Sequence, residues 1–454
     1  MKSARYSMHA GQLALKSYSV RWHHAGNQNG LSLVEVMIAL VIASIVGIGL
    51  TQIFIGSKQA FNTNSALARA QENSRFALGF LNEDLRMVGH LGTRNEQGAR
   101  PGAAEDSVGN LLFNHLAVDG GTNSRRPASA PWAYRLDIPF QVHEYSDTGM
   151  GQTLTLLAAP AVAGADNWLP ALAGTPLAAL AAEALRGSDI IVMRYLSADF
   201  VTLVNSRARA DGLAVSANVP FDATTGEFFW LTGNTPGFIV DGGIYAFSNA
   251  RAISLFQVTE VTTFPGGEAR AIALDGNNTL DWVSTPPLGA TGEVENSADY
   301  GSLLPVHRYE LVVYYIALGA DGGPALFRRR LDATKADGLG DKEEMVPGVE
   351  SMQVVMGVAN RAYPRNSDQP TTYMTANNIS TASWGSGTPD VDARWRSVVS
   401  ARIGLLMRST QQGTDQETGL SHNVAGTNIA PAATDKQLRF VYETQVSFRN
   451  RNRG

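Results

Sequence analysis

Cysteine is absent from this chain of 454 residues. Its absence excludes disulfide bonds, thiolate metal sites, cysteine nucleophiles and lipid attachment at a cysteine. It does not indicate a cellular compartment, because many exported proteins also lack cysteine. The rest of the composition, with 44% hydrophobic and 17% charged residues, is typical of a globular protein.

Acidic residues are missing from positions 1–30. The basic residues there are Lys2, Arg5, Lys16 and Arg21. Since the whole chain has a net charge of −5, residues 31–454 carry −9. A basic segment ahead of an apolar run predicts that the N-terminus stays in the cytoplasm. The acidic remainder argues against a general nucleic-acid binder.

Motifs of common enzymes are also missing. None of the eight histidines lies in an HExxH sequence, and no GxxxxGK loop occurs. The Gly-rich segment 384–389 lacks the pattern of a nucleophile elbow. The sequence therefore predicts a protein that is not an enzyme and that has no cofactor.

Two acidic loops are weak candidates for calcium, because oxygen ligands on alternate loop residues can hold Ca²⁺. The loop at 332–344 offers Asp337 and Asp341. The loop at 275–281 offers Asp275, Asn277 and Asp281. Neither fits the complete EF-hand pattern, so we expect solvated turns between strands and no bound metal.

Two basic segments, 327–330 and 448–454, could contact DNA. Such residues more often protect a strand edge from unwanted pairing. We expect that second role here.

Residues 36–57 form a run of 22 without a formal charge. As a helix they would measure about 33 Å, which is enough to cross a bilayer. A secretory signal peptide would be shorter and followed closely by a small-x-small cleavage site. The only tidy site of that kind, at 68–70, lies too far downstream.

Glu35 stands at the edge of this apolar run. A carboxylate at the centre of a membrane helix costs roughly 2.5–3.5 kcal/mol, and less near the helix end. The charge therefore calls for a partner, or for a side chain that extends to the lipid headgroups.

The segment Gly30-Leu31-Ser32-Leu33-Val34-Glu35 resembles the N-terminal signal of the type IV pilin class. That signal reads Gly, an apolar residue, Thr or Ser, Leu, Val or Ile, and Glu. The resemblance implies that a prepilin peptidase cuts after Gly30 and that Leu31 becomes an N-methylated mature terminus. The family usually has Phe at the position of Leu31.

The resemblance also implies a partner for Glu35. In pilins the carboxylate at this position pairs with an N-terminal amine, typically that of a neighbouring subunit. A charge pair in a low dielectric is strong only when both partners are present. Glu35 would thus set the register of stacked helices during assembly.

The helix is expected to continue well beyond the membrane segment, since no proline occurs before Pro101. Apolar residues recur at spacings of three and four, which predicts one buried helix face. These residues are Phe76, Phe80, Leu81, Leu85 and Val88. Gly89 and Gly92 then offer stop signals, so we predict one helix over 31–88, with a membrane half at 31–57.

The rest of the chain has the pattern of strands, and 309–331 reads as a hairpin around a glycine-rich turn. The other expected strand segments are 187–196, 242–261, 346–358, 395–409 and 438–452. Residues 100–185 form an insertion rich in Ala, Gly and Pro, and 360–392 and 410–436 look like long polar loops.

The expected fold class is α+β: a long N-terminal helix packed on a mainly antiparallel sheet with large loop insertions. We divide the chain into a removable leader at 1–30, the helix at 31–88 and a globular head at 89–454.

Within the pilin class, several segments most resemble PilW-type minor pilins. They are 82–92 (NEDLRMVGHLG), 187–195 (GSDIIVMRY), 255–261 (LFQVTEV), 346–358 (VPGVESMQVVMGV), the strand expected from Trp395-Arg396 to Arg408, and 447–452 (SFRNRN). Such proteins often place cysteines after the long helix and near residue 248. Here Thr93 and Ser248 stand near those places, so no disulfide can lock the head.

The resemblance implies a minor pilin held in the inner membrane by one helix, with its head in the periplasm, that later joins the extracellular pilus. Its partners would be the prepilin peptidase, the inner-membrane assembly machinery, the major pilin and other minor pilins. This group primes pilus assembly and sits at the filament tip, where it can carry an adhesin. Such pili serve cell adhesion and twitching motility.

Two alternatives remain. A J-like minor pseudopilin of a type II secretion system would share the N-terminal signal. A membrane-anchored periplasmic enzyme would instead need acids or histidines that converge in a cleft.

We expect the mature chain to begin at Leu31, with or without a methyl group. Mass spectrometry of the N-terminal peptide measures this directly. Translation from Met8 instead of Met1 would leave the same product. A mature terminus at Met1, or near Gln71, would contradict the pilin interpretation.

Overall fold

The computed structural model describes residues 32–92, 112–116, 131–157, 159–203, 221–222, 226–231, 237–248, 253–264, 267–273, 278, 305–335, 338–359, 369–381, 391–409, 420–432 and 437–451. The chain divides into two units, one ending at Lys58 and the next beginning at Gln59. The boundary lies within the first helix.

Helix α1 (Leu33–Met87) has 55 residues, and the single helix predicted over 31–88 is confirmed. In the first unit its apolar half (residues 33–58) is almost entirely exposed, including large side chains such as Ile45, Leu50 and Phe54. Within the described residues, α1 is the one helix whose length and composition would allow it to cross a membrane.

In the second unit, the packed half of α1 (residues 59–87) buries one face. The buried residues of this face are Ala66, Ala70, Ser74, Ala77, Leu81, Asp84 and Leu85, and Val88 follows just after the helix. The expected stripe is therefore confirmed at Leu81, Leu85 and Val88, and Phe80 packs against the same core.

The prediction was wrong for Phe76, whose side chain is 53% exposed. At about 100° of rotation per residue, Phe76 lies to one side of Ala77, which takes the buried position. The small side chains at Ala70 and Ala77 allow the helix to lie close to the strands.

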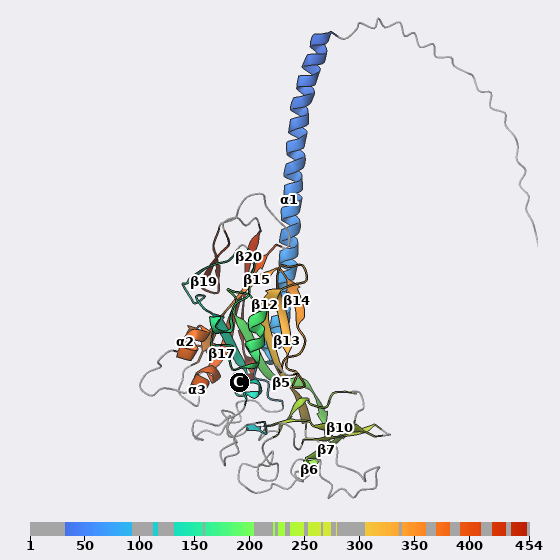
Figure 1. Ribbon diagram of the computed structural model, residues 1–454, viewed down its shortest axis with the longest axis vertical. Coiled ribbons are helices and arrows are strands. Elements are labelled where there is room, and N and C mark those ends of the chain that lie inside the picture. Colours follow the sequence, from blue (N-terminus) through green and yellow to red (C-terminus); the bar gives the residue numbers. More distant parts are fainter. Residues whose placement is uncertain are drawn as a thin grey trace, which may run out of the picture. The chain divides into compact units, whose positions relative to one another are not determined.

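The largest sheet has nine strands (Figure 1). Its main order is β1-β9-β8-β12-β5-β2-β4, and β13 and β14 continue from β12. Its strands are β1 (Leu112–Asn114), β2 (Phe140–Tyr145), β4 (Trp168–Leu169), β5 (Ile190–Thr202), β8 (Ile244–Ser248), β9 (Ile253–Gln257), β12 (Pro305–Leu318), β13 (Pro324–Arg330) and β14 (Glu343–Pro347). All pairs in it are antiparallel except β1 with β9.

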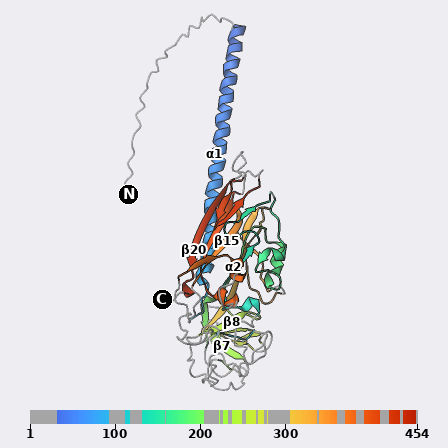
Figure 2. The ribbon, with the colours of Figure 1, turned by 90° about the vertical axis from the view of Figure 1, so that its left-hand side faces the viewer.

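A second sheet has the order β16-β15-β17-β20, with every pair antiparallel (Figure 2). Its strands are β16 (Thr372–Met374), β15 (Val349–Val358), β17 (Val398–Arg408) and β20 (Arg439–Ser447). The packed half of α1 and the facing sides of the two large sheets share one hydrophobic core.

Two smaller sheets complete the strands of the described residues. One has the order β10-β11-β7-β6, from β6 (Phe221–Asp222), β7 (Glu227–Leu231), β10 (Glu260–Thr263) and β11 (Glu268–Ile272). The other has the order β18-β19-β3, from β3 (Thr153–Thr155), β18 (His422–Val424) and β19 (Thr427–Ala430).

Short helices fill the connections. They are η3 (Trp132–Tyr134), η4 (Ala165–Asn167), η5 (Pro176–Ala182), α2 (Ala376–Thr381), α3 (Val391–Arg396) and η7 (Arg449–Arg451). Residues from 131–136 and 163–184 contribute to a second core on the face of the nine-stranded sheet that points away from α1.

The mainly antiparallel α+β fold is confirmed, and so is the hairpin at 309–331, formed by β12 and β13. The segment 346–358 is not one strand, because Gly348 turns the chain with φ +81° between β14 and β15. Trp395 and Arg396 end helix α3 and do not begin a strand. Trp395 enters the core from there, and Arg396 pairs with Asp137.

The segments expected to be loops contain short strands and helices. Strand β16 and helix α2 lie within 360–392, and β18 and β19 lie within 410–436. The larger correction is β2, which runs through the middle of the expected insertion at 100–185. All six of its residues are buried. The polar side chains among them have partners, because His143 Nδ1 is hydrogen-bonded to the Pro170 carbonyl and the Glu144 carboxylate accepts the Asn377 N–H.

A polar contact joins the two large sheets. The Asp189 carboxylate accepts backbone N–H bonds from Tyr145 (3.0 Å) and Val354 (2.8 Å). Beside it, the Ser351 hydroxyl donates to the Gly187 carbonyl, and the Met352 amide donates to the Ser188 hydroxyl. The segments GSD and ESMQVV, which carried part of the family resemblance, thus contact each other.

We expect Leu81→Ala to destabilise the head by roughly 2–5 kcal/mol, because it removes a fully buried side chain from the core. Phe76→Ala is the matched control on the same helix, and its effect should stay within about 0.5 kcal/mol. Denaturant unfolding of the full chain in mild detergent gives both values. Equal effects of the two changes would contradict the position assigned to the helix face.

Candidate assembly site and helix anchor

Glu35 lies in the first turn of α1, where its carboxylate accepts the backbone N–H of Ser32 at 3.1 Å. The Ser32 hydroxyl in turn accepts the N–H of Val34 at 3.3 Å. This reciprocal pair is a capping box, which satisfies N–H groups that a helix start leaves without partners. The Ser-x-x-Glu spacing was a readable signal for it.

The predicted cleavage residues, Gly30 and Leu31, and with them the predicted methylation site at Leu31, lie outside the described residues. Glu35 is exposed, as are the apolar side chains that follow it. The first unit therefore presents a carboxylate at a helix start, followed by an apolar helix that buries almost nothing in its own chain.

In the second unit, the packed half of α1 is anchored by a buried carboxylate, Asp84. Its Oδ1 accepts the hydroxyl of Tyr195 on β5 at 2.7 Å, and its Oδ2 accepts the hydroxyl of Tyr314 on β12 at 2.6 Å. The guanidinium groups of Arg328 and Arg330 on β13 lie 3.8 and 3.9 Å from the same carboxylate.

Burial has the largest effect on the pKa values of the titratable groups around Asp84. It raises the pKa of Tyr195 and Tyr314, and the negative charge of Asp84 raises both further, so the hydroxyls stay protonated as donors. Burial also raises the pKa of Glu310, although Arg330 and Arg308 partly offset this. Arg330 binds Glu310 at 3.3 Å and so connects Asp84 to a second acid.

The sequence analysis missed Asp84. The signal for it was an acid among the buried positions of an amphipathic helix, next to Leu85 and three residues after Leu81. The basic segment 327–330 supplies the two arginines that lie beside Asp84, Arg328 and Arg330. Arg328 also pairs with Glu343, and Arg329 pairs with Glu183. These arginines are committed to partners within the fold, not to a free basic surface.

A groove of about 690 Å³ runs beside the helix anchor. Its acids are Glu83, Asp84, Asp199 and Glu310, and its bases are Arg86 and Arg330. The volume is in the range of a ligand site, and convergent acids are what an enzyme would need. Yet both oxygens of Asp84 are bonded to tyrosine hydroxyls, and Glu310 is bonded to Arg330. The buried acids therefore act as structural acceptors.

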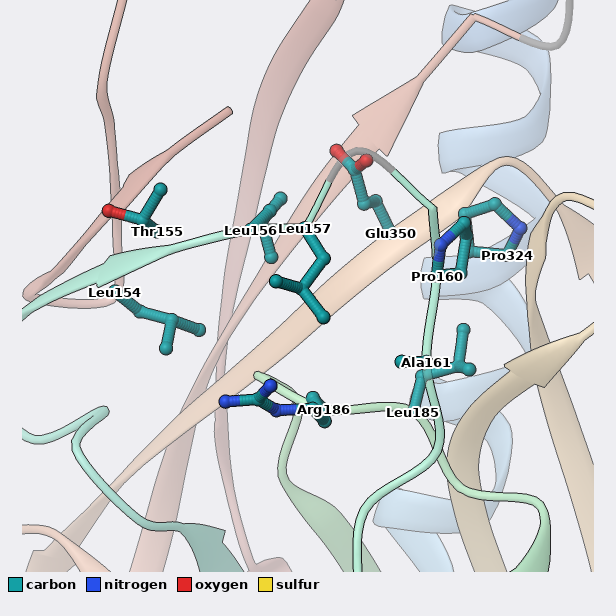
Figure 3. A pocket seen from close by; sticks show the side chains of 10 residues that line it. All are labelled: Leu154, Thr155, Leu156, Leu157, Pro160, Ala161, Leu185, Arg186, Pro324 and Glu350. Atoms are coloured by element: carbon teal, nitrogen blue, oxygen red, sulfur yellow. The ribbon is translucent and has the colours of Figure 1, made fainter. Parts of the chain in front are cut away.

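A smaller pocket lies under residues 154–161 (Figure 3). Apolar side chains such as Leu154, Leu157 and Leu185 line it, together with Arg186 and Glu350. Its volume is about 40 Å³, close to the space of one water molecule. It is too small for a substrate or a cofactor.

Of the calcium candidates, Asp341 alone lies within the described residues. Asp341 is 93% exposed, and its carboxylate pairs with the Lys335 ammonium at 2.5 Å. Asp337 lies outside the described residues, and so do Asp275, Asn277 and Asp281. In the described part of the chain, no three His, Asp or Glu side chains are placed to hold a metal ion.

The region where related proteins place cysteines is held by a hydrogen bond. The Ser248 hydroxyl donates to the Leu91 carbonyl at 2.6 Å. Gly92 follows with φ +75°, and a Cβ there would lie 2.6 Å from the Ser248 hydroxyl. The chain after the helix therefore lies against β8, as a disulfide would require, although Thr93 lies outside the described residues.

Protein-family models match a segment in each of the two units. The prokaryotic N-terminal methylation motif matches residues 26–51. The family described as type IV pilus-assembly protein W, PilW, matches residues 313–450. The chain matches a PilW-type minor pilin. No curated protein and no solved structure gives a significant match.

The PilW match covers the strands from the second half of β12 to β20, together with η7. Asp84, Tyr195 and Asp189 lie outside it. The PilW region is therefore anchored by side chains that come from α1 and β5, far away in the sequence.

We expect Asp84→Ala to destabilise the head by roughly 3–5 kcal/mol, because it leaves two buried tyrosine hydroxyls without their carboxylate acceptor and removes the negative charge beside two guanidinium groups. Asp84→Asn keeps an acceptor oxygen and should cost less. The neighbouring Glu83→Ala, at an exposed position, should change stability by less than about 0.5 kcal/mol. Denaturant unfolding of the full chain compares the three. A small effect for Asp84→Ala would show that the carboxylate does not anchor the helix.

Proposed function

We propose that this protein is a minor pilin that primes assembly of the type IV pilus and stays at its tip with other minor pilins. The observation that carries the proposal is the combination of the two family matches with the long helix that begins inside the first match. The N-terminal motif supports export and anchoring, and the PilW match supports a part for the head in pilus assembly.

The proposed life of the chain has two stages. A prepilin peptidase removes residues 1–30 on the cytoplasmic side, and the subunit waits in the inner membrane with its head, residues 89–454, in the periplasm. It then leaves the membrane with other minor pilins and the major pilin, and its apolar half exchanges lipid for neighbouring helices. The exposed apolar side chains of this half support such an exchange.

Glu35 controls the second stage in this proposal. Its carboxylate pairs with the N-terminal amine of a neighbouring subunit, in a surrounding of low dielectric where an unpaired charge is costly. Its bond to the Ser32 amide holds the carboxylate at the helix start before that partner arrives. The head takes part through its surfaces, as a structural component and not as a catalyst.

We expect Glu35→Ala to remain in the membrane at the wild-type level but to fall by at least about tenfold in sheared pili. Immunoblots of membranes and of sheared pili measure both quantities. Glu35→Gln is the informative control, because its side-chain oxygen can still accept the Ser32 N–H but carries no charge. If charge pairing drives assembly, Glu35→Gln should fail as Glu35→Ala does.

Assembly of Glu35→Gln at the wild-type level would assign the residue to helix capping alone. Absence of the wild-type protein from pili, or piliation unchanged by deletion of its gene, would contradict the function itself. A gene neighbourhood of secretion-channel components would point to the pseudopilin alternative.

A further inference from the structure

Strand β20 is unlike every other strand at the end of a sheet in the described residues. The eight other end strands are β1, β3, β4, β6, β10, β14, β16 and β18, and they have between two and five residues. Strand β20 has nine. Figure 2 shows it at the margin of its sheet.

The inner edge of β20 is fully paired. It runs antiparallel to β17 over nine consecutive residue pairs, from Ser400 with Ser447 to Arg408 with Arg439, without a bulge. Within the described residues, no strand pairs with its outer edge.

Two bonds at the ends of this ladder show which residues point outward. The Phe448 N–H donates to the Val399 carbonyl, and the Leu438 carbonyl accepts the Ser409 N–H. The backbone groups of these two even-numbered residues therefore face β17. Directions alternate along an antiparallel strand. The N–H and C=O groups of Val441, Glu443 and Gln445 therefore point away from the sheet.

Within the described residues, this edge lacks most of the usual protection. Natural sheets blunt their edges with short strands, lysine, proline, bulges or a covering segment. The sequence RFVYETQVS contains no lysine or proline, and the side chains of Glu443 and Gln445 are exposed. The one charge at the centre of the edge is the Glu443 carboxylate, which accepts the Ala425 N–H.

We propose that the outer edge of β20 receives an extended strand from another subunit of the pilus assembly. The free backbone groups fix the chemistry of the occupant: a segment of about five residues in β conformation, which bonds at Val441, Glu443 and Gln445. A basic side chain opposite Glu443 matches its charge. The inference rests on the proposed function, which supplies the second subunit.

A second copy of this chain fits the edge less well. Self-pairing of β20 centred on Glu443 would place two glutamates directly opposite each other, and like charges at that position repel. Partner side chains on the other face would lie beside Tyr442 and Val446, which pack against the core that contains α1. An apolar residue suits that face.

The test removes one backbone N–H group of β20 that points away from the sheet. Gln445→Pro removes a donor that no described residue of the head accepts from, and proline is tolerated at an edge position whose N–H points away from the sheet. We expect the full-length variant to reach the membrane normally but to fall at least about tenfold in sheared pili. That is the change expected from losing one or two intermolecular hydrogen bonds.

Two controls separate the edge from other effects. Gln445→Ala keeps the backbone N–H and loses only the side-chain bond to the Tyr373 hydroxyl, so it should assemble as wild type does. Tyr373→Pro makes the same change on β16, the other end strand of this sheet. Thr372 and Met374 pair with Val358 and Met356, whose backbone groups face β16, because the Met352 carbonyl on the same edge of β15 accepts from Asp189. The Tyr373 N–H between them therefore points outward, and this variant should also assemble normally.

Hydrogen exchange of the wild-type amides gives a readout that does not depend on a variant folding. The Glu443 and Gln445 amides should exchange fast in the isolated full chain and become protected in sheared pili. Protection already in the isolated chain, or its appearance only with homodimers, would overturn the inference. Wild-type recovery of Gln445→Pro in pili would overturn it while leaving the proposed function intact, whereas absence of the wild-type protein from pili would overturn both.

Discussion

The head depends on one constraint: a long helix must present a single face to a core built from strands that lie far apart in the sequence. Apolar contacts at Leu81 and Leu85 supply much of the stabilisation, but they are non-directional. The Asp84 carboxylate supplies direction, because its two oxygens are matched to tyrosine hydroxyls on β5 and β12. A rotation of the helix by one residue would leave a buried charge without partners, and that cost far exceeds a small loss of apolar contact.

The same principle joins the rest of the head in the absence of disulfides. The Asp189 carboxylate connects the end of β2 with β15, and the Ser248 hydroxyl holds the chain that leaves the helix. Each contact places a short polar side chain on a backbone group of a distant segment. A buried polar group without its partner would cost roughly 1–3 kcal/mol, so these contacts select one arrangement of the two large sheets.

The sequence was sufficient where local periodicity decides the structure. It predicted the extent of α1, the β12–β13 hairpin and the antiparallel α+β class, because long runs with a clear period leave few alternatives. It failed where tertiary partners decide. Phe76 has the right spacing for the core, but Ala77 occupies the buried position because close approach of the helix favours a small side chain. Strand β2 was missed because half of its residues are polar, and each of these makes a contact that the sequence does not reveal. Asp84 was missed for the same reason.

For the candidate assembly site, too, the sequence predicted the part that a local pattern decides. The motif around Gly30 predicted an assembly role for Glu35, since six consecutive positions fit one pattern. The capping box adds a physical reason for the spacing: Glu35 stands three residues after Ser32, where its Oε2 accepts the Ser32 amide. A carboxylate can accept at both oxygens, so this bond leaves Oε1 for a neighbouring amine. A side chain already held at the helix start loses less conformational freedom when its partner arrives. Capping and pairing are therefore compatible roles, and the first lowers the entropic cost of the second.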